Sequence, residues 1–278
     1  MNRYLKYGLS TVVVAFSLGI TTVVLASGFY APAAPAEGPY FNGPYLGIGA
    51  GIVHAHVDAN EEGSGEVTVE ETTHYNFDKS HNFDMGKCGF NGNVFVGYGK
   101  TFESSPSYYL GGEMFGNYLS PTLKGSSYSY TNPTGDGQKI MSMYTEVKNP
   151  YSFGGDIRGG YLVNPKTMVY ALFGLDYAQF KVKSGFGYQY IDMAIDRHVA
   201  HDFSKWKLGY MPGVGIETGL TAHVSLRAQY TYTFYSSFSK NVLNGDDQQP
   251  QKEYKEKLVT KVKPSTGLFT VKLSYLFN

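Results

Sequence analysis

The sequence has little charge, a single cysteine and a single tryptophan, and these scarcities exclude several classes of protein. Charged residues make up 17 % of the 278 residues and the formal net charge is zero, so the basic surface that nucleic-acid binding requires is missing. One cysteine, Cys88, excludes an internal disulfide and a cysteine-based metal framework. A mean hydropathy of −0.25 excludes a bundle of transmembrane helices.

Aromatic residues and glycine are abundant instead. The chain has 25 tyrosines, 18 phenylalanines and 34 glycines. This composition is typical of strands that face lipid on one side and are joined by tight turns.

The first 26 residues have the layout of a secretory signal peptide. Arg3 and Lys6 give a positive start, residues 9–25 form an uncharged and mostly apolar run, and Ala26 provides a small residue at the cleavage point. The alternative is a retained transmembrane helix, since the run approaches the length needed to span a bilayer. Serine, threonine and glycine within the run favour the signal peptide.

Eight later segments alternate apolar and polar residues with the period of two that is typical of strands. They cover residues 45–52, 91–99, 108–118, 153–163, 168–180, 207–220, 224–234 and 267–277. One face of nearly every segment is apolar, and the charge lies on the other face. A soluble β-barrel or sandwich, the alternative, would turn its apolar face inward. The pattern therefore predicts an all-β protein, an eight-stranded antiparallel up-and-down barrel that spans a membrane.

The connections between the segments alternate between short and long. Residues 100–107, 164–167 and 221–223 are short links, and the other four connections are long and polar. Outer-membrane barrels have short turns in the periplasm and long loops outside the cell. We therefore expect four long extracellular loops. Residues 66–77 leave two alternatives open, since they could extend strands above the membrane or make ten strands instead of eight.

Two stretches carry a resemblance to known proteins. The last segment, LFTVKLSYLF, resembles the assembly signal of bacterial outer-membrane proteins, which has apolar or aromatic residues at alternate positions. Those positions are Phe269, Val271, Leu273, Tyr275 and Phe277. The stretch PGVGIETGLTAHVSLRAQYTY resembles the eight-stranded surface-antigen family, which includes the transmembrane domain of outer-membrane protein A and the opacity-type proteins.

The residue patterns at the start of the chain and the resemblance, which covers roughly residues 43–278, together imply an arrangement for the whole chain. Residues 1–26 would be the cleaved signal peptide, residues 27–42 a Pro/Ala-rich periplasmic linker, and residues 43–278 the barrel domain in the bacterial outer membrane. The expected partners are outer-membrane lipid and lipopolysaccharide, the barrel-assembly machinery, and a host or envelope ligand at the loops. The barrel is expected to be a monomer without a nucleic-acid partner.

Charged residues on the inward faces are balanced in sign. They are Glu113, Asp156, Asp176, Glu217, Arg158, Lys207, Arg227 and Lys272. Side chains fill the interior of an eight-stranded barrel, so buried charges there must pair. Pairing the ends of the hairpin 220–224 places Glu217 opposite Arg227, and the family resemblance implies a second pair between Glu113 and Arg158. Such pairs would either plug the lumen and fix the register or gate the passage of ions.

The first and last long connections carry opposite charge. Residues 53–88 hold eight acids and two lysines, and residues 235–265 hold six lysines and four acids. Barrel closure makes the two connections neighbours. We expect attraction between them, a divalent cation on the acidic one, or simply two solvated surfaces.

The histidines do not predict a metal site, and no cofactor is expected. His54 and His56 stand two apart, while His198 and His201 stand three apart beside two aspartates. Two histidines per segment are fewer ligands than a zinc site requires. An outer-membrane lipid hydrolase or protease is a lesser alternative, because a GxSxG elbow is missing from the sequence.

The sequence thus favours a non-enzymatic surface protein. Its barrel would anchor loops that serve adhesion, host or envelope contact, and membrane integrity. Loops rich in Tyr, Ser, Gly and Asn suit adaptable contact surfaces. A narrow porin-like channel for small solutes is the main alternative.

Overall fold

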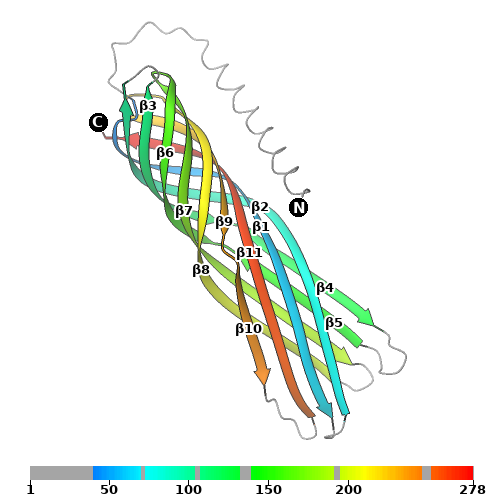
Figure 1. The fold of residues 1–278 in the computed structure, drawn as a ribbon. Helices are drawn as coiled ribbons and strands as arrows, with labels where there is room; N and C mark the ends of the chain where they lie inside the picture. The colour runs from blue at the N-terminus through cyan, green and yellow to red at the C-terminus, as the bar shows by residue number, and fades with distance from the viewer. Residues whose placement is uncertain are drawn as a thin grey trace. The chain divides into compact units, whose positions relative to one another are not determined.

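The computed structural model describes residues 40–69, 73–103, 107–131, 139–190, 195–245 and 252–277. These residues belong to one compact unit, Pro39–Asn278, built from antiparallel strands (Figure 1). In this part of the chain, no helix has both the length and the apolar character needed to cross a membrane. The predicted signal peptide, residues 1–26, lies outside the described residues, as does most of the predicted linker.

Eleven strands lie in the described residues. They are β1 Gly43–Val69, β2 Thr73–Phe102, β3 Tyr108–Leu119, β4 Thr122–Thr131, β5 Lys139–Lys148, β6 Tyr151–Asn164, β7 Thr167–Tyr190, β8 Ile195–Gly219, β9 Val224–Tyr235, β10 Phe238–Gly245 and β11 Lys252–Leu276. Eight of them, β1, β2, β3, β6, β7, β8, β9 and β11, pair in that order, and β11 pairs with β1 to close a ring. The prediction of an eight-stranded antiparallel barrel is confirmed.

The connections expected as long loops consist largely of strands that extend the barrel, which agrees with the alternative of strands that continue above the membrane. β1 and β2 continue as an unbroken hairpin from Gly43↔Gly99 to Val69↔Thr73, through residues 53–88. β4 continues the path of β3 after a break at Ser120, and β10 continues that of β9. The strands therefore project well beyond the segments that the alternation marked.

The reason is that the apolar face changes sides along the strands that run through both parts of the barrel, β1, β2, β7, β8 and β11. In β11, Val271 and Leu273 are exposed while Lys272 points into the lumen. Nearer the start of the same strand, Leu258 and Val262 are fully buried, and the lysine that precedes each of them, Lys257 and Lys261, is exposed. The period of two is unbroken, but the outward face is apolar in one half and charged in the other. The first half suits lipid and the second suits water.

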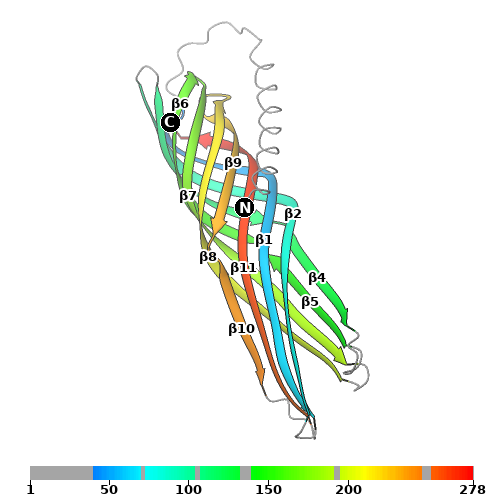
Figure 2. The ribbon, with the colours of Figure 1, turned by 45° about the vertical axis from the view of Figure 1, so that its right-hand side comes forward.

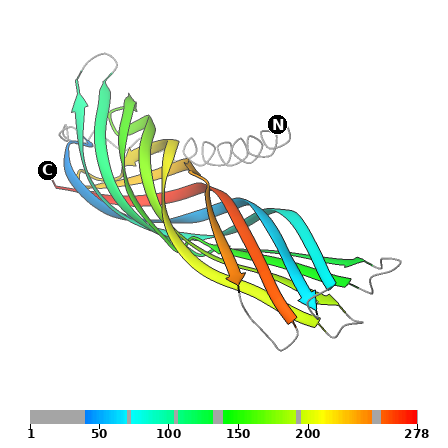
Figure 3. The same ribbon diagram turned by 60° about the horizontal axis from the view of Figure 1, so that its bottom comes forward.

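We call these parts the membrane half and the outer half of the barrel. The outer half comprises residues 53–69, 73–89, 122–131, 139–148, 180–190, 195–205, 238–245 and 252–265. There the strands form two four-stranded sheets, β4-β5-β7-β8 and β10-β11-β1-β2 (Figures 2 and 3). An apolar core lies between the sheets, and its largest members include Met143, Phe180 and Phe186. Residues 81–87 of β2 and 122–126 of β4 border a cleft of about 690 Å³ along one seam.

The two oppositely charged connections pair with each other in this half. Asp58 of β1 lies opposite Lys263 of β11, and Glu66 lies opposite Lys255. Both connections belong to continuous strands, so the antiparallel pairing of β1 with β11 brings the acids and the lysines together.

Aromatic side chains mark the border between the halves. Trp206 stacks on Tyr177 with ring centroids 5.2 Å apart, and Phe153 lies 5.5 Å from the same indole. On neighbouring strands, Tyr118 and Tyr151 are 5.8 Å apart. Such belts form at the interface between bilayer and water, where an aromatic ring can contact both. The border thus places the outer half outside the hydrocarbon layer.

Candidate functional site

Six buried charged residues meet inside the membrane half. They are Glu113 of β3, Asp156 and Arg158 of β6, Glu217 of β8, Arg227 of β9 and Lys272 of β11. Each occupies an inward position because it alternates with lipid-facing neighbours along its strand. Three acids and three bases share the lumen, so the formal charge of the cluster is zero.

Among the acids of this cluster, Glu113 contacts the largest number of basic residues. Its Oε2 accepts a hydrogen bond from Arg227 Nη1 at 2.6 Å, and its Oε1 accepts one from Lys272 Nζ at 2.7 Å. Arg158 Nη2 lies 3.6 Å from the same carboxylate. One acid from β3 therefore ties together bases from β6, β9 and β11.

Glu217 joins the two arginines from the other side. Its Oε2 accepts bonds from Arg227 Nε at 3.0 Å and Arg158 Nη1 at 3.1 Å, and its Oε1 accepts one from Ser225 at 2.6 Å. Glu217 and Arg227 are direct cross-strand partners in the β8–β9 ladder. Glu113, Arg227, Glu217 and Arg158 thus form a closed ring of ion pairs. Three of its four links are charge-assisted hydrogen bonds, which are the strong kind in a desolvated site.

Three tyrosines that were not among the predicted luminal residues complete the cluster. The Arg158 guanidinium lies over the rings of Tyr45, Tyr109 and Tyr170, at 5.2, 5.5 and 5.4 Å from their centroids. Arg158 also donates a hydrogen bond to the hydroxyl of Tyr109 at 3.1 Å. In the sequence, each of these tyrosines occupies an inward position of the alternation, and that position is the signal that identifies them.

Inward-facing glycines make room for these rings. A Cβ on Gly97 would lie 2.1 Å from the Tyr45 hydroxyl, and one on Gly215 would lie 2.3 Å from the Tyr170 hydroxyl. Side chains at these two positions would displace the tyrosines from the arginine. The glycines therefore allow the lumen to be packed with large polar side chains.

Two of the predicted luminal charges lie apart from the cluster. Asp176 Oδ2 accepts a hydrogen bond from Tyr235 at 2.5 Å, and the amine of Lys207 lies 5.4 Å from the centre of the Phe238 ring. Both residues are close to the apolar core of the outer half. Asp156, in turn, reaches only the edge of the cluster, with Oδ1 3.9 Å from Arg158 Nε. The cluster therefore holds three acids and three bases, one fewer of each than the sequence predicts.

The lumen is closed on both sides of the cluster. On the periplasmic side, Tyr40 and Phe41, which the sequence assigned to the linker, are buried, and the Tyr40 carbonyl accepts a bond from Thr101 Oγ1 at 3.2 Å. On the outer side lies a cavity of about 10 Å³ lined by residues such as Asn93 and Lys272. That volume holds about one water molecule.

The predicted assembly signal lies on the outer wall of the closing strand. Val271, Leu273, Tyr275 and Phe277 are all exposed on the lipid-facing side of β11 and its end. Their part in recognition by the assembly machinery stays a prediction.

Comparisons with known proteins agree with this architecture. The family model described as "Outer membrane protein beta-barrel domain" matches residues 21–277. The chain is 30% identical over 119 residues to the 22 kDa outer membrane protein of Rhizobium leguminosarum bv. viciae, a match that covers 42% of this chain and 49% of the relative. The chain thus spans about half the length of that curated relative.

Two solved structures illustrate the range of similar barrels. The attachment invasion locus protein Ail of Yersinia pestis is 9% identical with a TM-score of 0.25, and the match covers 76% of this chain and 97% of Ail. The outer membrane protease OmpT of Escherichia coli is also 9% identical, with a TM-score of 0.23 and coverage of 83% and 97%. Likeness at this level carries no argument about activity.

Proposed function

Because the chain belongs to the outer membrane protein β-barrel domain family, we propose that it is a non-enzymatic surface protein that holds a stiff platform outside the cell. The platform is the outer half, and it would contact a host or envelope ligand. The observation that carries this proposal is the apolar core between the two outer sheets. A loop exposed to water has no need of such a core, whereas a platform that keeps its shape does.

The membrane half suits an anchor better than a channel. The charge cluster crosses its lumen. Tyr40 and Phe41 close the periplasmic end of the lumen, and the core of the outer half closes the other end. An ion passing through would have to separate buried pairs, and breaking such a pair costs about 3–5 kcal/mol. We infer that the barrel holds the platform and that little passes through it.

Purified protein in planar lipid bilayers is therefore expected to give no stable, reproducible openings. A porin refolded and inserted by the same protocol serves as the positive control. Regular conductance steps whose number rises with protein concentration would contradict the anchor and support the channel.

Contact through the platform is tested by display on a bacterium that does not adhere to host cells. Wild-type protein is expected to raise adhesion to host cells or envelope components. Val262→Asp places a carboxylate in the core of the outer half, where Val262 is fully buried, so adhesion is expected to fall to background. The matched control Val271→Ala changes an exposed, lipid-facing residue of the same strand and is expected to adhere like wild type.

Surface amounts and resistance to SDS are measured alongside, so that the membrane half is known to be folded. Equal adhesion by wild type and Val262→Asp at equal surface amounts would contradict the role of the platform. Hydrolysis of lipid or peptide substrates by the purified protein would contradict the non-enzymatic part of the proposal.

A further inference from the structure

Three exposed tyrosines lie on the outer wall of the β4-β5-β7-β8 sheet, on the neighbouring strands β4 and β5 (Figure 1). Tyr128 and Tyr130 of β4 and Tyr144 of β5 are 67%, 51% and 47% exposed. Among the described residues, the other large apolar and aromatic side chains with such exposure lie in the membrane half or at its border, where lipid covers them. The described part of the outer half thus exposes large aromatic side chains to water at this wall alone.

The register of the sheet brings these tyrosines close together. Tyr128 lies opposite Ser142, and Tyr144 lies opposite Ser126. Tyr128 and Tyr144 are therefore diagonal neighbours, and Cβ atoms in that position lie about 7 Å apart. Tyr130 follows on the same face of β4, about 7 Å beyond Tyr128. The three rings and the two serines form one continuous stretch of the wall.

Two glycines of β7 let neighbouring rings lie against the sheet. A Cβ on Gly185, opposite Tyr144, would collide with the Tyr144 ring, and one on Gly187 would lie 2.5 Å from Nδ1 of His198. Both rings therefore lie across the backbone of β7, and the wall stays flat. His198 is exposed and lies 3.4 Å from Asp196. We call this surface the tyrosine wall, and it consists of Ser126, Tyr128, Tyr130, Ser142, Tyr144, Asp196 and His198.

The charged residues next to the tyrosine wall on its membrane side pair among themselves. Lys124 Nζ lies 3.2 Å from Glu146 Oε2, and Lys183 Nζ lies 3.7 Å from Asp202 Oδ2. The four residues form one cross-strand row in which the sign of the charge alternates. The row therefore adds no net charge to the wall, which favours a neutral ligand over a highly charged one.

The exposed area of the three tyrosines is small for a protein interface. With about 200 Å² for a whole side chain, the three rings together expose about 330 Å². A stable protein interface buries about 800 Å² on each partner and has an apolar centre. Three rings among serine hydroxyls fall short of that area, but they match a ligand of two or three sugar units.

Sugars have the surface chemistry that the tyrosine wall can bind. One face of many sugar rings presents C–H groups, which carry a slight positive charge and pack on the negative face of an aromatic ring. The hydroxyls at the edge of the sugar can exchange hydrogen bonds with Ser126, Ser142 and the Asp196 carboxylate. Tyrosine side chains have few rotatable bonds, so ordering them on binding costs little conformational entropy.

The tyrosine wall lies far above the lipid and above a row of lysines. About 26 Å of β7 separates Tyr177 of the aromatic belt from Gly185. Between these two levels, Lys148 lies opposite Lys181 in a cross-strand row that holds no acid. Phosphate groups of lipopolysaccharide in the same membrane suit that lower row. The neutral wall above it suits sugars of another surface.

We propose that the tyrosine wall binds a neutral oligosaccharide on the surface of a contacted cell. The sugar rings stack on Tyr128 and Tyr144, and Tyr130 extends the surface for a further unit. This site rests on the proposed function, because it names the chemical class of the ligand that the platform contacts. Many copies of the barrel in one membrane would strengthen a weak single contact through multivalency.

The experiment applies full-length protein, refolded in detergent, to an array of neutral, sialylated and sulfated oligosaccharides. Wild type is expected to bind neutral chains. Tyr128→Ala and Tyr144→Ala remove a stacking ring, so they should weaken binding at least about 10-fold. Tyr128→Phe keeps the ring and should stay within about threefold of wild type. Gly185→Ala keeps every binding residue but displaces the Tyr144 ring, so it should also weaken binding.

The matched control is Tyr98→Ala, because Tyr98 is a tyrosine of similar exposure that faces lipid in the membrane half. It should bind like wild type. The site is overturned if no neutral chain binds while a lectin binds the same array, or if only sialylated or sulfated chains bind. Equal weakening by Tyr98→Ala and Tyr128→Ala would also overturn it.

Adhesion of bacteria that display the protein separates this site from the proposed function. The site is supported if Tyr128→Ala lowers adhesion and if glycosidase treatment of the host cells lowers wild-type adhesion equally. Full adhesion by Tyr128→Ala overturns the site but leaves the platform role, which Val262→Asp tests. Wild-type adhesion that survives glycosidase yet depends on Tyr128 would assign the wall to a protein ligand. Competition by lipopolysaccharide from the same bacterium would replace the contacted cell with the bacterium's own envelope.

Discussion

Replacing Glu113 with glutamine is expected to lower the free energy of unfolding of the barrel by about 3–5 kcal/mol. Glu113 accepts bonds from Arg227 and Lys272 and lies beside Arg158. Glutamine has nearly the same volume, so packing is retained while the negative charge is lost. Three buried bases would then face two acids in a region where water cannot solvate the excess charge. The loss is measured by urea unfolding in lipid vesicles, with Trp206 fluorescence as the signal.

The matched control is Asp176→Asn, which also neutralises a buried luminal carboxylate. Asp176 lies outside the charge cluster and accepts its bond from a neutral tyrosine. We therefore expect a loss of only about 1 kcal/mol, the value of an ordinary hydrogen bond. Adding Lys272→Met to Glu113→Gln restores the balance of charge and should recover part of the lost stability. Equal effects of Glu113→Gln and Asp176→Asn would mean that charge balance does not hold the cluster together.

The second large effect concerns pH and a single acid in the outer half. Glu61 is fully buried between the two sheets and accepts hydrogen bonds from the hydroxyls of Thr145 and Ser184. Burial in this apolar core raises the pKa of Glu61 to about 7 from its usual value of 4.5, and the two hydroxyls only partly oppose the shift. The folded state therefore prefers the protonated acid.

The sign of the effect follows from the two pKa values. Below pH 4.5 Glu61 is protonated in both the folded and the unfolded chain, and its contribution to stability is fully present. Between pH 4.5 and 7 the unfolded chain releases the proton first, so stability falls as pH rises. Above the folded pKa the accumulated loss is about 3 kcal/mol, at 1.36 kcal/mol for each pKa unit.

Glu61→Gln is expected to remove this dependence. Glutamine can still accept from Thr145 and Ser184 but has no charge to desolvate. At pH 8 the variant should be more stable than wild type by about 3 kcal/mol, and near pH 4 the two should agree. Glu62→Gln provides the control, because Glu62 is adjacent in sequence but exposed. Resistance of the outer half to protease, followed from pH 4 to 8, gives the measurement. A Glu61→Gln profile parallel to that of wild type would contradict the assignment.

Alternation in the sequence predicted the ring but not the length of its strands. The eight segments stood out because one face of each was apolar, as Val271, Leu273 and Tyr275 are in the last strand. Beyond Ile52 the apolar residues of β1 change from even to odd positions, with Val53, Ala55 and Val57 buried inside. Short inward residues between charged outward ones look polar on average, so this stretch resembled a loop. A soluble sandwich was the alternative for the whole chain. Its arrangement, with apolar side chains inside and charged ones outside, is found in the outer half alone.

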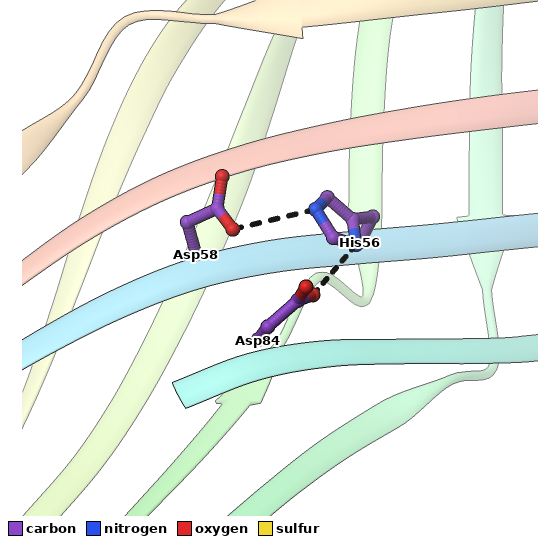
Figure 4. Close-up of side chains that lie close together, drawn as sticks. All are labelled: His56, Asp58 and Asp84. Carbon is purple, nitrogen blue, oxygen red and sulfur yellow. Dashed lines mark ion pairs between the residues drawn. The ribbon is translucent and has the colours of Figure 1, made fainter. Parts of the chain in front are cut away.

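Contacts between luminal side chains could be predicted only where a single turn fixes which residues of two strands lie opposite each other. The tight hairpin after Gly219 places Glu217 opposite Arg227 by counting residues from its ends. The contact of Arg227 with Glu113 crosses the barrel between strands that are not neighbours, so no local count reveals it. The same limit hid the ion pair of His56 with Asp84 (Figure 4). Asp84 comes from the partner strand, and its position depends on a register that residues 53–88 reveal only once they are known to be strands.

The reversal of faces between the two halves constrains how the chain can reach the cell surface. Lys181 and Lys183 of β7 and Lys257 and Lys261 of β11 point outward where the strands meet water. Each lysine facing lipid at the bilayer midplane would cost about 2–4 kcal/mol, so the finished outer half cannot slide through the membrane. The same charged wall opposes movement of the folded barrel back through the bilayer and so holds it in the membrane in one direction.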